Sequence, residues 1–541
     1  MGVIVKPTRK TLTDRQTKQT QLMIFPYFTD NQIIPFIVSA VIIISSIVTF
    51  QLDKKRTALI LLFLGSLGLG FFIANLDHFL ILWDEQYHAL VAKNMLDNPF
   101  KPTLYSTPLL EYDYRNWTAN HIWLHKQPLF LWQIALSLKF FGINELAVRI
   151  PSILLHAIAA LMIYRIGKIS YSPTVGFYGA LFFSVAYHPL ELIAGKYATD
   201  HNDIAFLFYV TASFWAWFEY QNSKNSYWLI LIGIFSGCAV LVKWLVGLLI
   251  YAVWTISLGV NDKKNWLKLK AYFPILISFT ISLLVFIPWQ LYTFYKYPLE
   301  AKYEFQLNTE HFFKPIENHG GDFWFHFNAV KDIYGSGDAV PFLLLLGLFL
   351  FLKKSVSKMY RVAILSAIII TYGFFTLAST KMTSFCIIVS PFVFLGLATL
   401  TDLSINFLKT KIKFKNFEMF FRPVALIAVC FFLINISKIA NYHTEWKPKD
   451  NCNRKAELKQ MTIIKKLSDS LHGDSCVVFN TDMRVNGHIS VMFYTDYIAY
   501  DFIPDKRQIK KIKMQSFKIA ILDTDSLPDF IRNDNDIIKI K

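Results

Sequence analysis

Residues 57–88 read TALILLFLGSLGLGFFIANLDHFLILWDEQYH. The first part, Thr57 to Asn75, is an apolar run long enough to cross a bilayer as a helix. Asp84 and Glu85 follow shortly after it. Carboxylates this close to a bilayer are costly when they face lipid. We therefore expect the pair to stand in a water-facing loop at the mouth of a helix bundle, with Asp84 as a base. On these residues alone, a solvated loop without a chemical role is the competing interpretation.

The composition of the whole chain repeats this apolar pattern. Of its 541 residues 54% are hydrophobic and only 17% are charged, whereas soluble domains carry about 25% charged residues. The apolar runs predict about 11–13 spanning helices, which excludes an ordinary soluble protein. The net charge of +17 is typical of lysine and arginine in cytoplasmic loops. The chain has no basic-aromatic motif for nucleic acid, so we expect no nucleic-acid partner.

The chain divides into three parts by composition. Residues 1–32 form a polar, basic N-terminal tail, 33–440 a mainly α-helical transmembrane domain, and 441–541 a small α/β domain. The distribution of lysine and arginine places the C-terminal domain and the loops 76–149 and 291–337 on the outer side. We expect spans near 33–50, 57–75, 150–166, 174–190, 204–220, 227–241, 244–260, 272–290, 338–352, 361–378, 385–401 and 423–440.

Shorter elements are expected outside the spans. Residues 89–96 and 129–141 have apolar positions at helical spacing but are too short to cross a bilayer, which predicts helices lying along the interface. In the C-terminal part, the pattern predicts a helix over 454–471 and strands at 476–479, 517–522 and 537–540.

Charged and polar residues gather in the outer segments and at the outer helix ends, far apart in the sequence. If the spans form a bundle, these side chains converge on one outward-facing cavity. Lysine can hold a phosphate as a point charge, and aspartate can accept a proton from an attacking hydroxyl. A single lysine at a helix end is often only snorkelling to the headgroups. The histidines match no zinc spacing, so no metal ligand is assigned, and a divalent metal is neither demanded nor excluded.

Two stretches carry a family resemblance. Residues 125–132, HKQPLFLW, and 141–152, FGINELAVRIPS, resemble the Lys-Pro-Pro-Leu…Trp…Phe-Gly…Asn-Glu…Ala-Val-Arg…Pro-Ser block of the GT-C membrane glycosyltransferases. These are the enzymes related to protein O-mannosyltransferase and to lipid A aminoarabinose transferase. The sequence also resembles further motifs of that family at Asp84-Glu85 with Tyr87, and at Asp203, Lys243 and Ser379-Thr380-Lys381.

The resemblance implies a GT-C fold and a function. It implies an integral membrane glycosyltransferase that moves a sugar from a polyprenyl-phosphate donor to an acceptor hydroxyl, with inversion, on the outer side of the membrane. The high content of Lys, Ile, Asn and Phe indicates a bacterial source, so we expect the bacterial inner membrane, with the active site facing the periplasm. The acceptor could be a protein, a lipid or a glycan. Asp84, with Glu85, would be catalytic, and the lysines would bind the donor phosphate: Lys126, Lys243 and Lys381. The substrate pocket would include Tyr87, His125, Asp203, His311 and His319.

The sequence also departs from the family pattern. Gln127 replaces the first proline of the block, and His125 and Tyr87 stand where the aminoarabinose branch has Glu and Arg. These changes argue against aminoarabinose transfer and leave the sugar open. Two other classes remain: a transporter or flippase of lipid-linked sugars, and a non-catalytic lipid-binding scaffold.

Overall fold

The structure is a computed structural model. It describes residues 28–197, 199–261, 267–335, 337–412, 417–443, 452–471, 475–481, 486–524 and 526–540. Most of the expected tail 1–32 therefore lies outside the described residues, as does the segment that joins the transmembrane and C-terminal parts.

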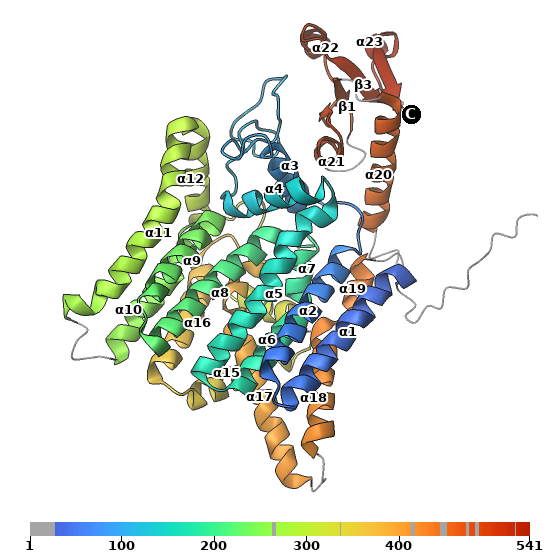
Figure 1. Cartoon of the computed structure of the whole chain (residues 1–541). Helices are drawn as coiled ribbons and strands as arrows, with labels where there is room; N and C mark the ends of the chain where they lie inside the picture. The colour runs from blue at the N-terminus through green and yellow to red at the C-terminus, as the bar shows by residue number, and fades with distance from the viewer. Residues whose placement is uncertain are drawn as a thin grey trace, which may run out of the picture.

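Each apolar run predicted to span the membrane forms a helix (Figure 1). Eight helical segments of the described chain are long and apolar enough to cross a membrane. This is fewer than the twelve predicted spans because residues 227–260 count as one segment, because α6 and α15 have only 13 and 15 residues, and because α8, which has polar residues at both ends, is not among the eight. The prediction of a mainly helical membrane bundle is confirmed. The bundle helices are α1 (Asp30–Gln51), α2 (Lys55–Ala74), α5 (Glu145–Ser170), α6 (Pro173–Val185), α7 (Tyr187–Ile193), α8 (Asp200–Ser223), α9 (Tyr227–Lys243), α10 (Leu249–Asn261), α11 (Leu269–Lys296), α15 (Val340–Lys354), α16 (Lys358–Leu377), α17 (Ser390–Lys411), α18 (Phe417–Ile434) and α19 (Ile436–His443).

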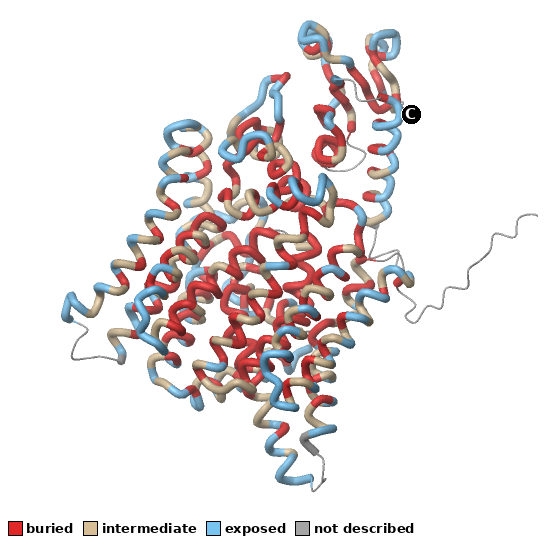
Figure 2. Tube along the Cα trace, viewed as in Figure 1, coloured by how far each residue is buried: buried red, intermediate tan, exposed pale blue. Residues whose placement is uncertain are grey.

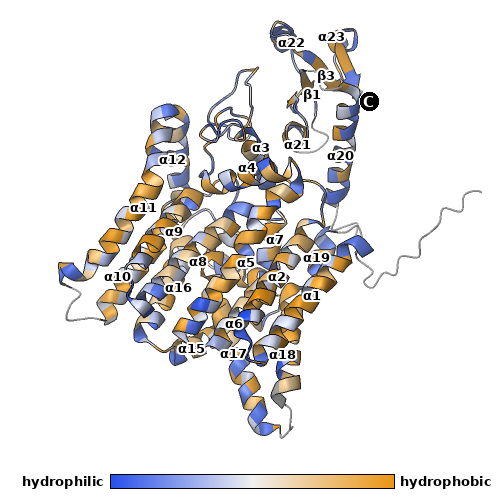
Figure 3. Cartoon of the chain, viewed as in Figure 1, coloured by the Kyte–Doolittle hydropathy of each residue, from blue (hydrophilic) through white to orange (hydrophobic). Residues whose placement is uncertain are grey.

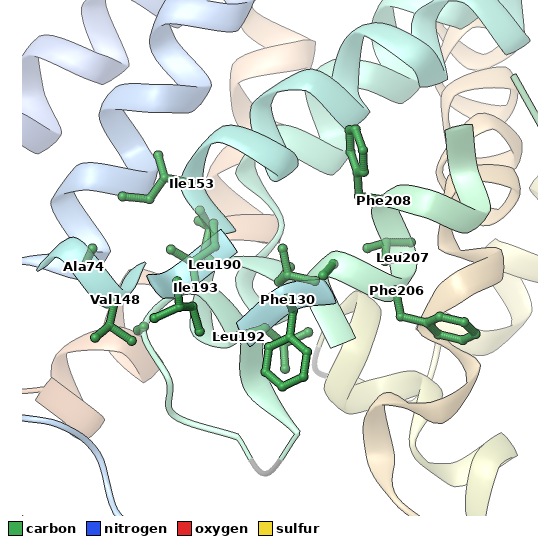
Figure 4. Packing of buried hydrophobic residues seen from close by; sticks show 14 of the residues in the cluster. Ala74, Phe130, Val148, Ile153, Leu190, Leu192, Ile193, Phe206, Leu207 and Phe208 are labelled. Carbon is green, nitrogen blue, oxygen red and sulfur yellow. The ribbon is translucent and has the colours of Figure 1, made fainter. Parts of the chain in front are cut away.

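Small residues bring the bundle helices close together. A Cβ added to Gly167 of α5 would lie 2.5 Å from the Cα of Gly176 in α6, and one added to Gly347 of α15 would lie 2.6 Å from the carbonyl oxygen of Gly396 in α17. Close backbone approach of this kind drives helix association in lipid. Burial is greatest through the centre of the bundle (Figure 2). Large apolar side chains such as Phe130, Leu190 and Phe206 belong to this buried core (Figure 4).

Three further helices lie at one end of the bundle: α3 (Asp84–Asn94), α4 (Leu129–Phe141) and α12 (Pro298–Phe313) (Figure 1). The helix expected over 129–141 has those bounds. Asp84, expected in a loop, is instead the first residue of α3. Most of α3 is buried, because α4 and the C-terminal region pack against it. Helix α3 therefore lies enclosed between α4 and the C-terminal region, whereas residues 89–96 were expected along the membrane interface.

The C-terminal region contains a four-stranded parallel sheet in the order β2-β1-β3-β4. Strands β1 (Cys476–Phe479), β3 (Lys518–Leu522) and β4 (Ile537–Ile540) lie where strands were expected, and so does helix α20 (Cys452–Leu471). Strand β2 (Ile498–Ala499) has only two residues, too few to give a pattern. The other helices of this region are α21 (Gly487–Tyr494), α22 (Lys506–Lys513) and α23 (Asp529–Arg532). Outside it, the short helices are η1 (Trp244–Leu248), α13 (Phe325–Asn328), α14 (Val330–Tyr334) and η2 (Thr383–Val389).

The C-terminal region docks on α3. Lys93 Nζ donates hydrogen bonds to the carbonyl oxygens of Met492 at 2.9 Å and Thr495 at 2.6 Å, at the end of α21. A lysine at this position satisfies carbonyls that the helix leaves unpaired. Gln86 Nε2 also donates to Ser490 Oγ at 2.9 Å. Hydrophobic residues predominate along the bundle, whereas the C-terminal region mixes hydrophobic and hydrophilic residues (Figure 3).

Candidate active site

The first turn of α3 carries the two adjacent acids, and their side chains point to different surroundings. Asp84 Oδ2 accepts a hydrogen bond from the backbone N–H of Thr199 at 2.7 Å and lies 4.0 Å from Lys126 Nζ. Trp83 and Thr199 both have φ of 68°. This conformation is unfavourable for bulky and β-branched residues and tends to mark functional sites. The backbone on both sides of Asp84 is therefore held in place by the surrounding structure.

Asp84 and Lys126 lie on the wall of a cavity of about 330 Å³. Its lining comes from the start of α3, the adjoining ends of α8 and α9, and α12, and from residues 125–127, 244–246, 317–319 and 374–385. Polar groups on this wall include the carboxylate of Asp84 and the ammonium groups of Lys126 and Lys243. Several aromatic rings line it as well: Phe206, Phe305, Phe312, Phe374 and Phe385. The cavity thus offers both a charged surface and a broad apolar one.

The charges around Asp84 keep it ionised. Burial alone would raise the pKa of its carboxyl, but the positive charge of Lys126, with contributions from His88 and the N–H of Thr199, lowers this pKa to about 2. Burial lowers the pKa of His88 to about 4. At neutral pH, Asp84 is therefore a carboxylate and His88 is a neutral imidazole, whose Nδ1 lies 3.0 Å from Asp200 Oδ1.

Lys243 and Asp203 form an ion pair at the edge of the cavity. The Lys243 side chain is 21% exposed, whereas that of Asp203 is 2% exposed. The hydroxyl of Thr199 donates to the other carboxylate oxygen of Asp203. Thr199 therefore connects Asp84, through its N–H, to Asp203 and Lys243. Of the ion pair, only Lys243 lines the cavity.

Three histidines also line the cavity. The ring of His125 stacks on Trp117 at a centroid distance of 4.4 Å, and its Nδ1 lies 3.4 Å from Glu304 Oε2. His311 Nδ1 lies 3.0 Å from the hydroxyl oxygen of Thr380, and burial lowers the pKa of His311 to about 4. His319 accepts a hydrogen bond at its backbone carbonyl from the N–H of Lys381 at 2.8 Å.

Glu85 does not reach the cavity, contrary to its prediction as a catalytic residue. Its carboxylate is fully buried and accepts two hydrogen bonds from Arg149, at 2.7 and 2.9 Å. Arg149 also donates to the carbonyl oxygens of Ala74, Asp77 and Phe79. Successive residues on a helix point about 100° apart, so Glu85 faces the bundle when Asp84 faces the cavity. The pair fixes the turn between α2 and α3.

Tyr87 and Lys381 also lie elsewhere. Tyr87 donates its hydroxyl hydrogen to Asn486 Oδ1 at 3.1 Å and faces the C-terminal region. Lys381 Nζ donates to the carbonyl oxygens of Thr376 at 2.8 Å and Ala378 at 2.7 Å, which caps the end of α16. Four predicted site residues are therefore absent from the cavity lining: Glu85, Tyr87, Asp203 and Lys381. Six lie on it: Asp84, His125, Lys126, Lys243, His311 and His319.

Sequence reasoning missed two residues that build the site, Arg149 and Thr199. Arg149 stands in the Ala-Val-Arg stretch of the quoted block, and an arginine inside an apolar run is itself a signal of a buried partner. Thr199 carried no signal, because its role rests on a backbone N–H and a left-handed conformation. In the described ranges, no group of three or more His, Cys, Asp or Glu side chains is placed to hold a metal ion.

Parts of the chain are similar in sequence to known proteins. Residues 125–292 match the family model of dolichyl-phosphate-mannose-protein mannosyltransferases. The chain is 30% identical over 203 residues to an uncharacterized protein of Aquifex aeolicus, over 37% of each chain. It is 25% identical over 256 residues to the undecaprenyl phosphate-α-4-amino-4-deoxy-L-arabinose arabinosyl transferase of Pseudomonas paraeruginosa, over 44% of this chain and 41% of that one. These matches therefore span less than half the length of the curated relatives.

Solved structures match over more of the chain. ArnT from Cupriavidus metallidurans, bound to undecaprenyl phosphate, superposes with a TM-score of 0.61 over 84% of this chain and 87% of ArnT, at 12% identity. The archaeal oligosaccharyltransferase AglB from Archaeoglobus fulgidus superposes with a TM-score of 0.53 over 82% of this chain and 64% of AglB, at 12% identity. At these identities the matches establish a common fold.

Proposed function

We propose that this chain, which shares its fold with ArnT and AglB and matches the mannosyltransferase family model over residues 125–292, transfers a sugar from a polyprenyl-phosphate donor to an acceptor hydroxyl. One observation carries the proposal. A carboxylate, Asp84, and an ammonium group, Lys126, lie 4.0 Å apart on the wall of a cavity that also carries aromatic side chains. A base, a phosphate-binding cation and an apolar surface for a lipid are the three requirements of that reaction.

In this mechanism Lys126 and Lys243 bind the donor phosphate. The acceptor oxygen attacks the anomeric carbon while the bond from that carbon to the phosphate oxygen breaks, which inverts the configuration. The two lysines stabilise the charge that develops on the departing phosphate. This leaving group needs no proton, so a single base suffices. Asp84 takes the proton of the acceptor hydroxyl.

The pKa of Asp84 fits a base that acts late. A carboxylate with a pKa of about 2 removes little proton from a resting hydroxyl. As the new bond forms, the attacking oxygen becomes strongly acidic, and the carboxylate then accepts its proton. The N–H of Thr199 holds one oxygen of Asp84, which orients the carboxylate for this step.

The aromatic part of the cavity supports a lipid donor. Phe206, Phe305 and Phe374 supply apolar lining beside the lysines, as an isoprenoid chain next to its phosphate requires. The structurally similar ArnT was solved with undecaprenyl phosphate bound. We propose the same class of donor here, with the cavity facing the periplasm of a bacterial inner membrane. The distribution of lysine and arginine between the loops supports that orientation.

The test uses purified full-length protein and a panel of polyprenyl-phosphate monosaccharides with protein, lipid and glycan acceptors. Release of polyprenyl phosphate with one donor, together with a glycosylated acceptor, is the expected result. In liposomes, movement of the intact donor across the bilayer without release would instead indicate a flippase. Binding of the donor with neither outcome would indicate a non-catalytic scaffold.

A further inference from the structure

A second cavity, of about 410 Å³, lies between the first outer loop and the C-terminal region. The loop contributes Tyr87 and Tyr112 to its lining, and the C-terminal region contributes Asn486, His488 and Phe502. None of these residues lines the cavity that contains Asp84. The two cavities share a wall, because Tyr87 packs edge-on against Trp117, and Trp117 stacks on His125, which lines the Asp84 cavity.

The charges of the second cavity are opposite to those of the first. Its described lining includes three carboxylate residues, Glu111, Asp113 and Asp501, and neither lysine nor arginine. Asp113 is paired with the nearby Arg115 at 2.9 Å. In a chain with a net charge of +17, this excess of negative groups is a local feature. It disfavours a phosphate or other anion and favours a neutral or cationic ligand.

Two buried polar atoms on this wall have no hydrogen-bond partner in the described part of the chain. They are Asn486 Nδ2 and His488 Nδ1, on residues that are 7% and 4% exposed. Unpaired buried polar groups are costly and uncommon in native proteins. The amide nitrogen is a donor, and the ring nitrogen can donate or accept. A ligand rich in hydroxyl groups could satisfy both, because each hydroxyl donates and accepts.

The aromatic side chains of the cavity complete this pattern. Tyr112 is 43% exposed and Phe502 39% exposed, although both line a recess. Tyr105 and Tyr500 stack on one another at 5.2 Å and 18°, and both line it too. Aromatic faces carry partial negative charge and receive the weakly positive C–H groups of a sugar ring. Rings beside amide and carboxylate groups suit a ligand with apolar faces and polar edges.

We propose that the second cavity is a carbohydrate-binding site that holds a neutral or amino-bearing acceptor glycan. This proposal rests on the proposed transferase function, and it assigns the acceptor as a glycan instead of a peptide. Tyr87 and Asp84 lie within one turn of α3, and Tyr87 donates a hydrogen bond to Asn486 on the wall of the second cavity. The same helix therefore contributes the base to one cavity and a lining residue to the other, and Trp117 and His125 lie between them.

The test measures ligand binding to the full-length protein in detergent without any donor. The probes are neutral oligosaccharides and chitosan oligomers, compared with phosphorylated sugars and uncharged peptides. We expect binding of at least one neutral or amino-bearing oligosaccharide. We expect Tyr112→Ala and Phe502→Ala to weaken it about tenfold each, the loss of one stacking contact. Tyr227→Ala, which removes an exposed ring outside this cavity, is the matched control and should bind as the wild type does.

The same binding measured on Asp84→Asn separates the two proposals. Unchanged glycan binding by this variant, whether or not the protein transfers sugar, supports the carbohydrate site on its own. Three results would overturn it: no oligosaccharide binds, binding is the same in the Tyr112 and Phe502 variants, or peptides or phosphorylated sugars bind more tightly than neutral ones. The melting temperature of each variant checks that its fold is intact.

Discussion

Lys126 Nζ lies 4.0 Å from Asp84 Oδ2, and both side chains are partly exposed to the same cavity. At this separation the two charges attract each other, but each group remains able to bind a substrate. Lys126 keeps the Asp84 carboxylate ionised. Because the two groups are 4.0 Å apart, a donor phosphate can replace Asp84 as the partner of Lys126. The ion pair of Lys243 with Asp203 is closer, and we assign Lys243 a supporting part in phosphate binding.

Lys126→Met should change the pH dependence of transfer as well as donor affinity. The charge of Lys126 lowers the pKa of Asp84, so its removal raises that pKa. Asp84 then becomes protonated at a higher pH, so the acid limb of the pH–rate profile moves to higher pH. Affinity for polyprenyl phosphate should also fall by about tenfold or more, since a charged contact is lost. An acid limb that does not move would show that the base is not Asp84.

Lys381→Met should leave donor affinity within about twofold of the wild type. The ammonium group of Lys381 caps carbonyls at the end of α16 and is absent from the cavity lining. We expect a loss of stability of about 1–2 kcal/mol, because buried carbonyls lose their donors. Titration with polyprenyl phosphate beside Lys126→Met tests this. If Lys381→Met loses as much donor affinity as Lys126→Met, Lys381 binds the donor phosphate after all.

Glu85→Gln should act mainly by destabilising the fold of the protein. Removal of one partner from a buried ion pair costs about 3–5 kcal/mol, and Arg149 would keep its charge in a fully buried place. We expect a lower melting temperature and a lower yield. Arg149→Met should behave similarly. A Glu85→Gln protein with wild-type stability and no activity would instead support a direct catalytic part for Glu85.

Gly195→Ala tests the packing behind the acid pair. A Cβ at Gly195 would lie 2.4 Å from the carboxyl carbon of Glu85, and the residue has φ of 74°, which L residues rarely adopt. The substitution should displace Glu85 and lower the melting temperature by several degrees. Gly259→Ala is the control, because its Cβ would meet no atom within 4 Å. Equal stability of the two variants would contradict the packing described here.

Much of the fold could be predicted from the sequence because its signals are local. Apolar runs, interrupted by lysine and arginine, marked the spans, and the bounds of α4 follow from Pro128 and Gly142 at its two ends. The burial of α3 was harder to predict. Its apolar positions suggested a helix on the membrane surface, but α21 and α4 pack against the helix. Sequence periodicity shows that a face is apolar and not what covers it.

The convergence of Asp84, Lys126 and Lys243 on one cavity could be predicted because charged groups near a bilayer are costly unless they share a polar site. Their roles as base and phosphate ligands follow from the family resemblance and stay a prediction. The separation of Asp84 from Glu85 could not be predicted, since it depends on where Arg149 lies in three dimensions. The same holds for Thr199, which acts through its backbone. The proposed carbohydrate site joins residues about 400 positions apart, such as Tyr87 and Asn486, and no local pattern joins them.

The central claim is that Asp84 is the base, and the most direct measurement is the rate of polyprenyl phosphate release by Asp84→Asn under single-turnover conditions. We predict a rate at least about a hundredfold below that of the wild type, with unchanged melting temperature and donor affinity. Asp97→Asn, which alters an exposed carboxylate beyond the end of α3, is the matched control and should release at the wild-type rate. Release by Asp84→Asn at the wild-type rate would contradict the account.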